Sequence, residues 1–222
     1  MPVTSTVLDR RPHQRAGDPV SFQTVKQAAF LVVCTLALSL FLKSFIVQLF
    51  AVPSGSMEPT LAIGDKIAVL RVLTRRGSPH RGDIIVFQDP GGWLSEPRLP
   101  RSVSVQALEF VGMIPYHSGE HLVKRVVGEA GDMVECRGVG PLYVNGVAVR
   151  EPFVKPGARP CSGEFQVTVP ARSVWVMGDN RNNSADSRFH LSDARRGSVP
   201  LSLVVGEVAF TAWPPTHWGW WA

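Results

Sequence analysis

The stretch that decides the fold of this chain is Leu122-Val123-Lys124-Arg125-Val126-Val127-Gly128. Its β-branched residues and closing glycine predict a β-strand, and alternation along a strand puts Leu122, Lys124 and Val126 on one face. Lys124 therefore lies between two aliphatic neighbours. A lysine acts as a base near neutral pH only if burial lowers its pKa from about 10.4. The alternative is a lysine whose ammonium group reaches solvent, and this stretch alone leaves both open.

Similar short runs occur on both sides of this strand. Each combines β-branched or aromatic residues with flanking Gly, Pro, Asp or Asn, which is typical of strands separated by turns. Val144-Asn145-Gly146-Val147 adds a hairpin signal, because Asn-Gly tolerates the positive φ values of a type I′ turn. The other runs are Ile63–Leu70, Asp83–Phe87, Met133–Cys136, Leu142–Val149, Gln166–Val169, Val174–Met177 and Leu203–Phe210. We therefore expect a mainly β domain, with a long loop within Pro90–Gly119.

Composition narrows the class of protein. The chain has 222 residues, 45% of them hydrophobic, and its 20 glycines and 18 prolines are too many for a helical bundle. Three cysteines are too few for a disulfide scaffold, and no CxxC or HExxH pattern offers a metal site. A net charge of +5 is weak evidence for nucleic-acid binding, so no nucleic-acid partner is expected.

One apolar segment differs from this average composition. Between Ala28 and Val52 the only residues outside the apolar set are Thr35, Ser39, Lys43, Ser44 and Gln48. Because about 20 mostly apolar residues suffice for a helix to cross a bilayer, we expect a transmembrane anchor over residues 27–49. A cleaved signal peptide is one alternative, but no small-x-small cleavage site follows the segment. A fully buried core helix is the other.

Residues 1–26 are expected to form a flexible cytoplasmic tail. They are rich in Pro, Gln, Ser and Thr, and they hold Arg10, Arg11, Arg15 and Lys26 against Asp9 and Asp18. Basic residues are enriched on the cytoplasmic side of membrane proteins, so residues 50–222 are expected on the outer side. Basic residues soon after the apolar segment weaken this bias; they are Lys66, Arg71, Arg75 and Arg76.

Two serines follow the apolar segment, in Pro53-Ser54-Gly55-Ser56-Met57-Glu58-Pro59-Thr60-Leu61. Serines flanking a glycine can form a plain turn, and a serine hydroxyl is a poor nucleophile without a base. A Ser-His-Asp arrangement with His190 and Asp193 is disfavoured, because no GxSxG elbow accompanies it. Lys124 is the other candidate base.

A polar cluster lies further on, in Gly178-Asp179-Asn180-Arg181-Asn182-Asn183-Ser184-Ala185-Asp186-Ser187-Arg188. Such a composition is typical of a tight surface loop whose side chains bond the backbone. It can equally hold a neighbouring lysine in place through Ser184.

Together and in this order, these clusters resemble bacterial type I signal peptidases. Ser54-Gly55-Ser56-Met57-x-Pro59-Thr60 is similar to that family's nucleophile motif, and Lys124-Arg125-Val126-Val127-Gly128 to its base-bearing motif. Further matches are Gly64-Asp65, Arg81-Gly82-Asp83-Ile84-Ile85-Val86-Phe87, Gly131-Asp132 and the cluster from Gly178 to Arg188. The resemblance implies an antiparallel β catalytic domain over 50–222, with a small accessory β-region at about 137–175.

The resemblance also implies catalytic roles. Ser56 would be the nucleophile and Lys124 the general base. The Ser54 hydroxyl and the Ser56 N–H would form the oxyanion hole, where donors stabilise the charge that develops in acyl transfer.

Supporting roles follow in the same way. Ser184 would hydrogen-bond and orient Lys124, and Asp186 and Arg188 would form an ion pair near the site. Apolar pockets that accept alanine at −1 and −3 of the substrate would be lined by Phe50, Val52, Met57, Leu61, Ile67, Leu122 and Val123. Asn182 stands where many family members have aspartate.

The implied function is a membrane-bound serine endopeptidase at the outer face of a bacterial plasma membrane. It would cross the membrane once and remove signal peptides from exported preproteins after a small-x-small site. Its partners would be signal peptides and the lipid bilayer, with the secretion machinery as a further candidate, and neither a metal nor a cofactor is implied. A Ser/Lys autoprotease resembling the repressor-cleaving family is disfavoured by the anchor. An inactive anchored domain that binds exported chains is disfavoured by the presence of every motif residue.

Two features stay open at this level. Cys136 and Cys161 would lie in an oxidising compartment, which permits a disulfide, but the sequence does not show whether their Cα atoms are close enough. Four tryptophans fall in the last ten residues: Trp213, Trp218, Trp220 and Trp221. They favour either an interfacial belt on the lipid surface or aromatic packing against the core.

Overall fold

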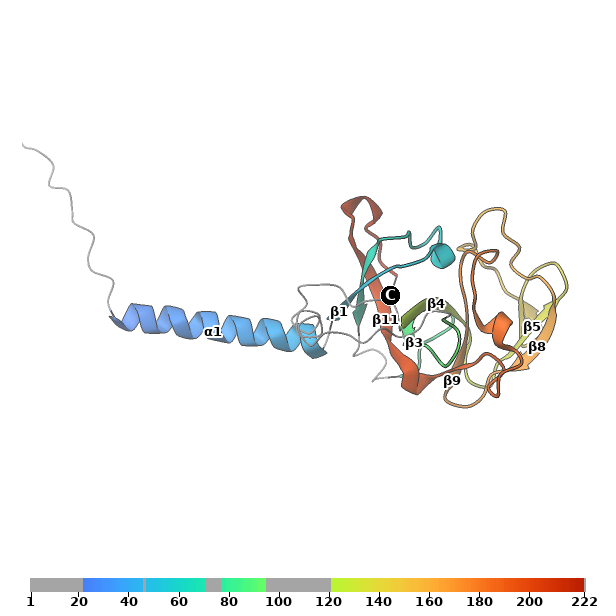
Figure 1. The fold of residues 1–222 in the computed structure, drawn as a ribbon, viewed down its shortest axis with the longest axis horizontal. Coiled ribbons are helices and arrows are strands. Elements are labelled where there is room, and N and C mark those ends of the chain that lie inside the picture. The colour runs from blue at the N-terminus through green and yellow to red at the C-terminus, as the bar shows by residue number, and fades with distance from the viewer. Residues whose placement is uncertain (1–21, 46, 71–76, 95–120, 222) are drawn as a thin grey trace, which may run out of the picture. The chain divides into compact units, whose positions relative to one another are not determined.

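The computed structural model of the protein describes residues 22–45, 47–70, 77–94 and 121–221 (Figure 1). The chain divides into two compact units, residues 1–39 and 40–222. Most of the expected tail, residues 1–21, lies outside the described residues, as does the greater part of the loop expected within Pro90–Gly119.

The first described element is helix α1 (Phe22–Phe45). Its hydrophobic side chains occur on all sides of the helix, and the side chains of residues 23–39 are exposed. None of the helices in the described residues combines the length and apolar character that a membrane crossing requires. The spanning segment over 27–49 therefore stays a prediction. The helix also begins inside the expected tail and ends before residue 49.

Strands of the second unit form a seven-stranded antiparallel sheet in the order β1-β2-β11-β3-β4-β9-β10. The strands are β1 (Val47–Ala51), β2 (Lys66–Leu70), β3 (Ile84–Gln88), β4 (His121–Gly128), β9 (Ser173–Met177), β10 (Val199–Pro200) and β11 (Val204–Trp213). The prediction of a mainly β domain is confirmed. β1 takes up residues expected at the end of the anchor, because Phe50 is buried and the strand pairs along its length with β2.

A smaller four-stranded sheet has the order β7-β6-β5-β8. Its strands are β5 (Met133–Arg137), β6 (Tyr143–Val144), β7 (Val147–Ala148) and β8 (Glu164–Thr168). The predicted hairpin turn is confirmed, with φ of 53° at Asn145 and 79° at Gly146. The accessory sheet thus starts before residue 137 and ends before 175, because β9 pairs with β4 in the larger sheet. A disulfide joins Cys136 to Cys161, whose Cα atoms are 5.8 Å apart.

Short 3₁₀ helices complete the described elements: η1 (Gly55–Met57), η3 (Ser187–His190), η4 (Leu201–Leu203) and η5 (Pro215–His217). Trp213, the last residue of β11, is exposed, and so are Trp218 and Trp220 beyond it, at 70% and 80%. Trp221 instead packs against a core cluster. Packing on the core therefore accounts for one of the four C-terminal tryptophans.

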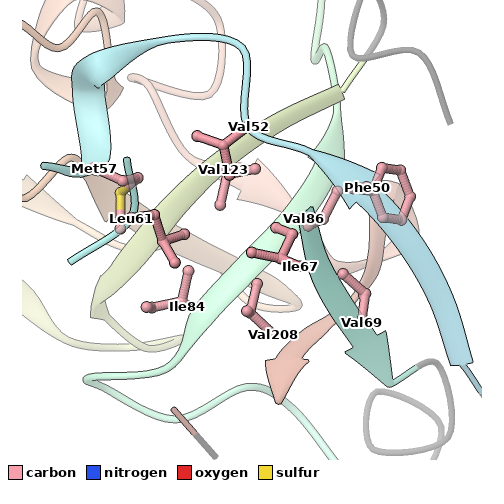
Figure 2. Packing of buried hydrophobic residues seen from close by; sticks show 10 residues of the cluster. All are labelled: Phe50, Val52, Met57, Leu61, Ile67, Val69, Ile84, Val86, Val123 and Val208. Carbon is pink, nitrogen blue, oxygen red and sulfur yellow. The ribbon is translucent and has the colours of Figure 1, made fainter. Parts of the chain in front are cut away.

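The core next to η1 gathers side chains from five strands and the turn after β1 (Figure 2). Its members are Phe50, Val52, Met57, Leu61, Ile67, Val69, Ile84, Val86, Val123 and Val208. Six of the seven expected pocket residues belong to this cluster. Leu122 does not, because it follows the strand alternation onto the other face and packs in a second cluster with Phe87 and Trp93. Leu122 is thus outside the cluster that the other six form, and its place in the pockets stays a prediction.

Candidate active site

The turn that carries Ser56 is anchored on both sides. Ser54 has extended backbone geometry and precedes η1. Met57 ends η1, and its side chain is buried. The Leu61 N–H donates to the Met57 carbonyl at 3.0 Å, and the Val52 N–H donates to the Asp65 carbonyl at 2.8 Å. Ser56 is consequently held with only 7% of its surface exposed.

Lys124 faces this serine from the middle of β4. All eight residues of β4 are buried, and Lys124 itself is 4% exposed. Its Nζ donates to the Ser56 Oγ at 2.7 Å. The alternative of an ammonium group that extends to solvent is therefore wrong.

Burial changes the chemistry of this amine. Desolvation of the charged form lowers the pKa of Lys124 from 10.5 to about 8, with a smaller contribution from Arg188. The carboxylates of Asp186 and Asp179 act in the opposite direction and raise the pKa. An amine with a pKa near 8 has a substantial neutral fraction near neutral pH, so it can accept a proton from a hydroxyl.

Ser54 is exposed and lies next to Ser56. Its hydroxyl donates to the Ser56 Oγ at 3.3 Å. The side chain is thus next to the atom that would attack a substrate.

Ser184 is placed near the site but not as expected. It is buried, and among the described residues its Oγ has no hydrogen-bond partner. The expected hydrogen bond between Ser184 and Lys124 is not formed in this structure, in which the Lys124 amine donates to Ser56. Ser184 instead packs over Gly178: a Cβ at position 178 would overlap both the Ser184 hydroxyl and the Ser56 carbonyl oxygen. The loop approaches the turn that carries Ser56 at a point where only glycine fits.

Asp186 and Arg188 form the expected ion pair. The Arg188 Nε and Nη2 donate to the two carboxylate oxygens at 2.8 and 2.9 Å. The same carboxylate accepts the Gly178 N–H at 3.1 Å. The pair therefore fixes the backbone of the close approach at Gly178.

A second buried ion pair had no role assigned from the sequence. Arg125, next to Lys124 on β4, donates from Nε and Nη2 to Asp179 at 2.9 and 2.7 Å. The Asp179 carboxylate also accepts the Thr60 hydroxyl. These contacts join β4, the loop after β9 and the segment after the nucleophile. Arg125 and Asp179 both lie in motifs that the sequence showed, but nothing in the sequence indicated that these two residues form an ion pair.

Asn180 was also not identified as a functional residue. Its backbone N–H donates to the Ser56 carbonyl and its side-chain Nδ2 to the Gly55 carbonyl, both at 3.0 Å. Its neighbour Arg181 is buried and donates to Glu151 and to the carbonyls of Gly178 and Pro160. An Asn in a polar cluster suggests a turn, and only the fold shows that its acceptors lie on the nucleophile turn.

Comparison with known proteins agrees with this geometry. A family model described as signal peptidase, peptidase S26, matches residues 24–213. The signal peptidase I of Mycobacterium tuberculosis is 39% identical over 226 residues, which cover 90% of this chain and 76% of that protein. The probable signal peptidase I of Mycobacterium leprae is 37% identical, over 91% of this chain and 81% of its own.

Among solved structures, a signal peptidase I from Enterococcus faecalis matches with 26% identity and a TM-score of 0.39, over 59% of this chain and 97% of its own. The family assignment follows from the family model and the sequence relatives alone. The chain belongs to the signal peptidase family, peptidase S26, the serine endopeptidases that remove signal peptides from preproteins.

Proposed function

We propose that this signal peptidase cleaves its substrates with Ser56 as nucleophile and Lys124 as general base. The observation that carries the proposal is the 2.7 Å contact between Lys124 Nζ and Ser56 Oγ in a buried setting. Burial supplies the lowered pKa that a lysine base needs, and the contact supplies the path for the proton.

The reaction follows from these atoms. The neutral amine of Lys124 takes the Ser56 proton as Oγ attacks the carbonyl carbon of the scissile peptide. The resulting oxyanion is stabilised by the Ser56 N–H and by the Ser54 hydroxyl, which turns to it from its contact with Ser56 Oγ. The Lys124 ammonium then gives its proton to the nitrogen of the scissile bond. The C–N bond breaks, the amine departs, and the acyl-enzyme remains on Ser56. Water, deprotonated by the same amine, hydrolyses the ester and restores Ser56.

The supporting residues tune this base. Asp186 and Asp179 keep the pKa of Lys124 from falling further, while Arg188 opposes them. Ser184 lies close to Gly178, and its hydroxyl has no hydrogen-bond partner within the described part of the chain. It is therefore available to accept a hydrogen bond from the Lys124 amine when that amine turns from Ser56 to the leaving group. We therefore assign Ser184 to the proton-transfer step rather than to the resting state.

Substrate selection is assigned to the apolar cluster beside the nucleophile. We expect the pockets for the −1 and −3 side chains to be lined by Phe50, Val52, Met57, Leu61, Ile67 and Val123, which pack together in this structure (Figure 2). The pairing of β4 with β9 begins at Arg125. On the side of β4 that faces β9, the backbone of residues 122–124 is therefore not paired with β9. An extended signal peptide can add there as a strand, with its scissile bond beside Ser56.

A single-pass anchor is part of the same proposal. Helix α1 is apolar on all sides and its described side chains are exposed, a pattern that suits a lipid surrounding better than water. We propose that α1 holds the enzyme in the plasma membrane, with residues 50–222 outside and the tail 1–26 inside. If so, sodium carbonate will not extract the full chain from membranes; release into the soluble fraction would contradict the anchor.

The decisive experiment is cleavage of a synthetic precursor that carries a small-x-small site, with mass spectrometry of the new N-terminus. The full chain is expected to cut after the second small residue, and Ser56→Ala and Lys124→Ala are expected to abolish cleavage with unchanged thermal unfolding. Lys66→Ala, which removes an exposed lysine on β2, is the matched control and should cleave at the normal rate. Full activity of the Lys124→Ala variant would rule out the dyad. The match to the family over residues 24–213 favours this enzyme over an inactive scaffold.

A further inference from the structure

One residue of the loop after β9, Asn180, restrains the turn Ser54–Met57, which we call the nucleophile turn. Asn180 is buried, with 6% of its surface exposed, and both of the hydrogen bonds that it donates end on backbone carbonyls of this turn. The side-chain amide donates to Gly55 and the backbone N–H to Ser56. Two successive peptide groups on either side of the Ser56 Cα are therefore fixed by a single residue.

The first of these peptide groups contains the expected oxyanion donor. The Gly55 carbonyl and the Ser56 N–H belong to the same peptide unit, which is trans. In a planar trans peptide the C=O and the N–H point in opposite directions. A donor that fixes the direction of the Gly55 carbonyl consequently also fixes the direction of the Ser56 N–H.

The turn's own hydrogen bond is the weaker restraint on this carbonyl. The Glu58 N–H also donates to the Gly55 oxygen, but at 3.3 Å, against 3.0 Å for the Asn180 amide. A hydrogen bond accepted by a peptide carbonyl also polarises the unit and makes its N–H a better donor. The Asn180 amide thus restrains the orientation of the Ser56 N–H and strengthens it as a donor.

The position of Asn180 relative to Lys124 is fixed by neighbouring residues. Its neighbour Asp179 forms the bidentate ion pair with Arg125, the residue after Lys124 on β4. A short chain of contacts therefore connects the strand of the base, the loop and the nucleophile turn. Asn180 makes the last of these contacts, the one to the nucleophile turn.

We propose that Asn180 is a positioning residue that sets the oxyanion hole, by aiming the Gly55–Ser56 peptide so that the Ser56 N–H points at the developing oxyanion. The inference rests on the proposed roles of Ser56 and Lys124. It predicts a defect in transition-state stabilisation, with substrate binding and the base left intact.

The test compares Asn180→Ala with Asn182→Ala in the full chain. Asn182 lies two positions along the same loop and is exposed, so its variant should retain the normal rate. For Asn180→Ala, kcat should fall by about tenfold to a hundredfold, less than the 10²–10³ expected when an oxyanion donor is removed outright. KM should change little, because the lost interaction matters in the transition state. The pH midpoint of the rate should stay where it is, because Asn180 carries no charge.

A peptide aldehyde based on the substrate provides a second readout. Ser56 Oγ adds to its carbonyl carbon, and the resulting hemiacetal oxygen occupies the oxyanion position. Asn180→Ala should weaken binding of this aldehyde by about the same factor as kcat/KM, while binding of the cleaved signal peptide stays unchanged. If Asn180→Ala does not fold, Asn180→Asp keeps the shape and the backbone hydrogen bond but has no side-chain N–H to donate. Measured on the plateau of its pH profile, it should show the same loss.

The outcomes separate this inference from the proposed function. Normal kcat in the Asn180 variants, while Ser56→Ala is inactive, would overturn the role of Asn180 and leave the dyad standing. A raised KM with a shifted pH midpoint would also overturn it, because that pattern indicates a displaced site. If Ser56→Ala cleaves normally, the dyad and this inference fail together.

Discussion

The Nζ of Lys124 lies 2.7 Å from the Oγ of Ser56, although the two residues are 68 positions apart in the sequence. The lysine reaches the serine from a strand that is buried along its whole length, so the contact is formed where water is excluded. Proximity and desolvation thus act on the same pair of atoms, and each has consequences that can be measured.

The cleavage rate should follow the deprotonation of Lys124. Because burial lowers the pKa of this amine to about 8, kcat/KM is expected to rise with pH and to level off above a midpoint near 8. Only the neutral amine can accept the Ser56 proton, so the rate must fall as the pH drops below that value. A pH series with a synthetic precursor measures it, and a flat profile between pH 6 and 9 would contradict a lysine base.

Replacing the base by an apolar residue should stabilise the fold. A lysine whose pKa falls from 10.5 to about 8 on folding destabilises the native state by up to about 3 kcal/mol at pH values where it is charged in both states. Lys124→Met removes this cost. The variant is therefore expected to be inactive but more resistant to denaturant at pH 7.

The sign of the pH dependence makes this test specific. As the pH rises from 8 towards 10.5, the folded wild type loses its proton before the unfolded chain does, so the wild type gains stability and the advantage of Lys124→Met shrinks. Denaturant unfolding at pH 7 and pH 9.5 measures both values, with the exposed Lys66→Met as control. An advantage of Lys124→Met over wild type that is equally large at both pH values would be incompatible with a buried lysine of lowered pKa.

Removing the Ser184 hydroxyl should separate activity from stability. An unsatisfied buried hydroxyl costs about 1–3 kcal/mol, so Ser184→Ala is expected to leave the thermal midpoint unchanged or to raise it. If the hydroxyl receives Lys124 during proton transfer, the same variant should lose about tenfold in kcat, at the low end of what a proton-transfer group contributes. Thermal unfolding and steady-state kinetics on the same preparation measure both. A drop in the midpoint with normal kcat would indicate a purely structural hydroxyl.

Neutralising Asp186 should lower both the stability of the fold and the pKa of Lys124. Asp186→Asn leaves the buried guanidinium of Arg188 without its charge partner, and losing one member of such a pair costs about 3–5 kcal/mol. The Asp186 carboxylate also raises the pKa of Lys124, so its removal should move the midpoint of the pH–rate profile below 8. Asp193→Asn, at a more exposed carboxylate, is the control and should change neither quantity. A midpoint that moved upwards would show that the Asp186 charge does not act on Lys124.

Local patterns explain what could be predicted from the sequence. β4 and the Asn145–Gly146 turn follow from alternation and from backbone preferences of neighbouring residues, and both are found as expected. The motifs that carry Ser56, Lys124 and the Asp186–Arg188 pair were also visible, as a resemblance. Helix α1 ends before the expected residue, because apolar composition does not distinguish a helix from the partly buried edge strand β1.

By itself, the sequence determined which residues are present and which lie on the same face of a strand, because those properties depend on near neighbours along the chain. Tertiary structure alone decided that Lys124 is buried against Ser56, that the Ser184 hydroxyl has no hydrogen-bond partner among the described residues, and that Asn180 donates two hydrogen bonds to the turn that carries Ser56. Desolvation and hydrogen bonding depend on which distant segments pack together, and here the packing of β4 between β3 and β9 buries Lys124 and lowers its pKa into the range that a general base needs.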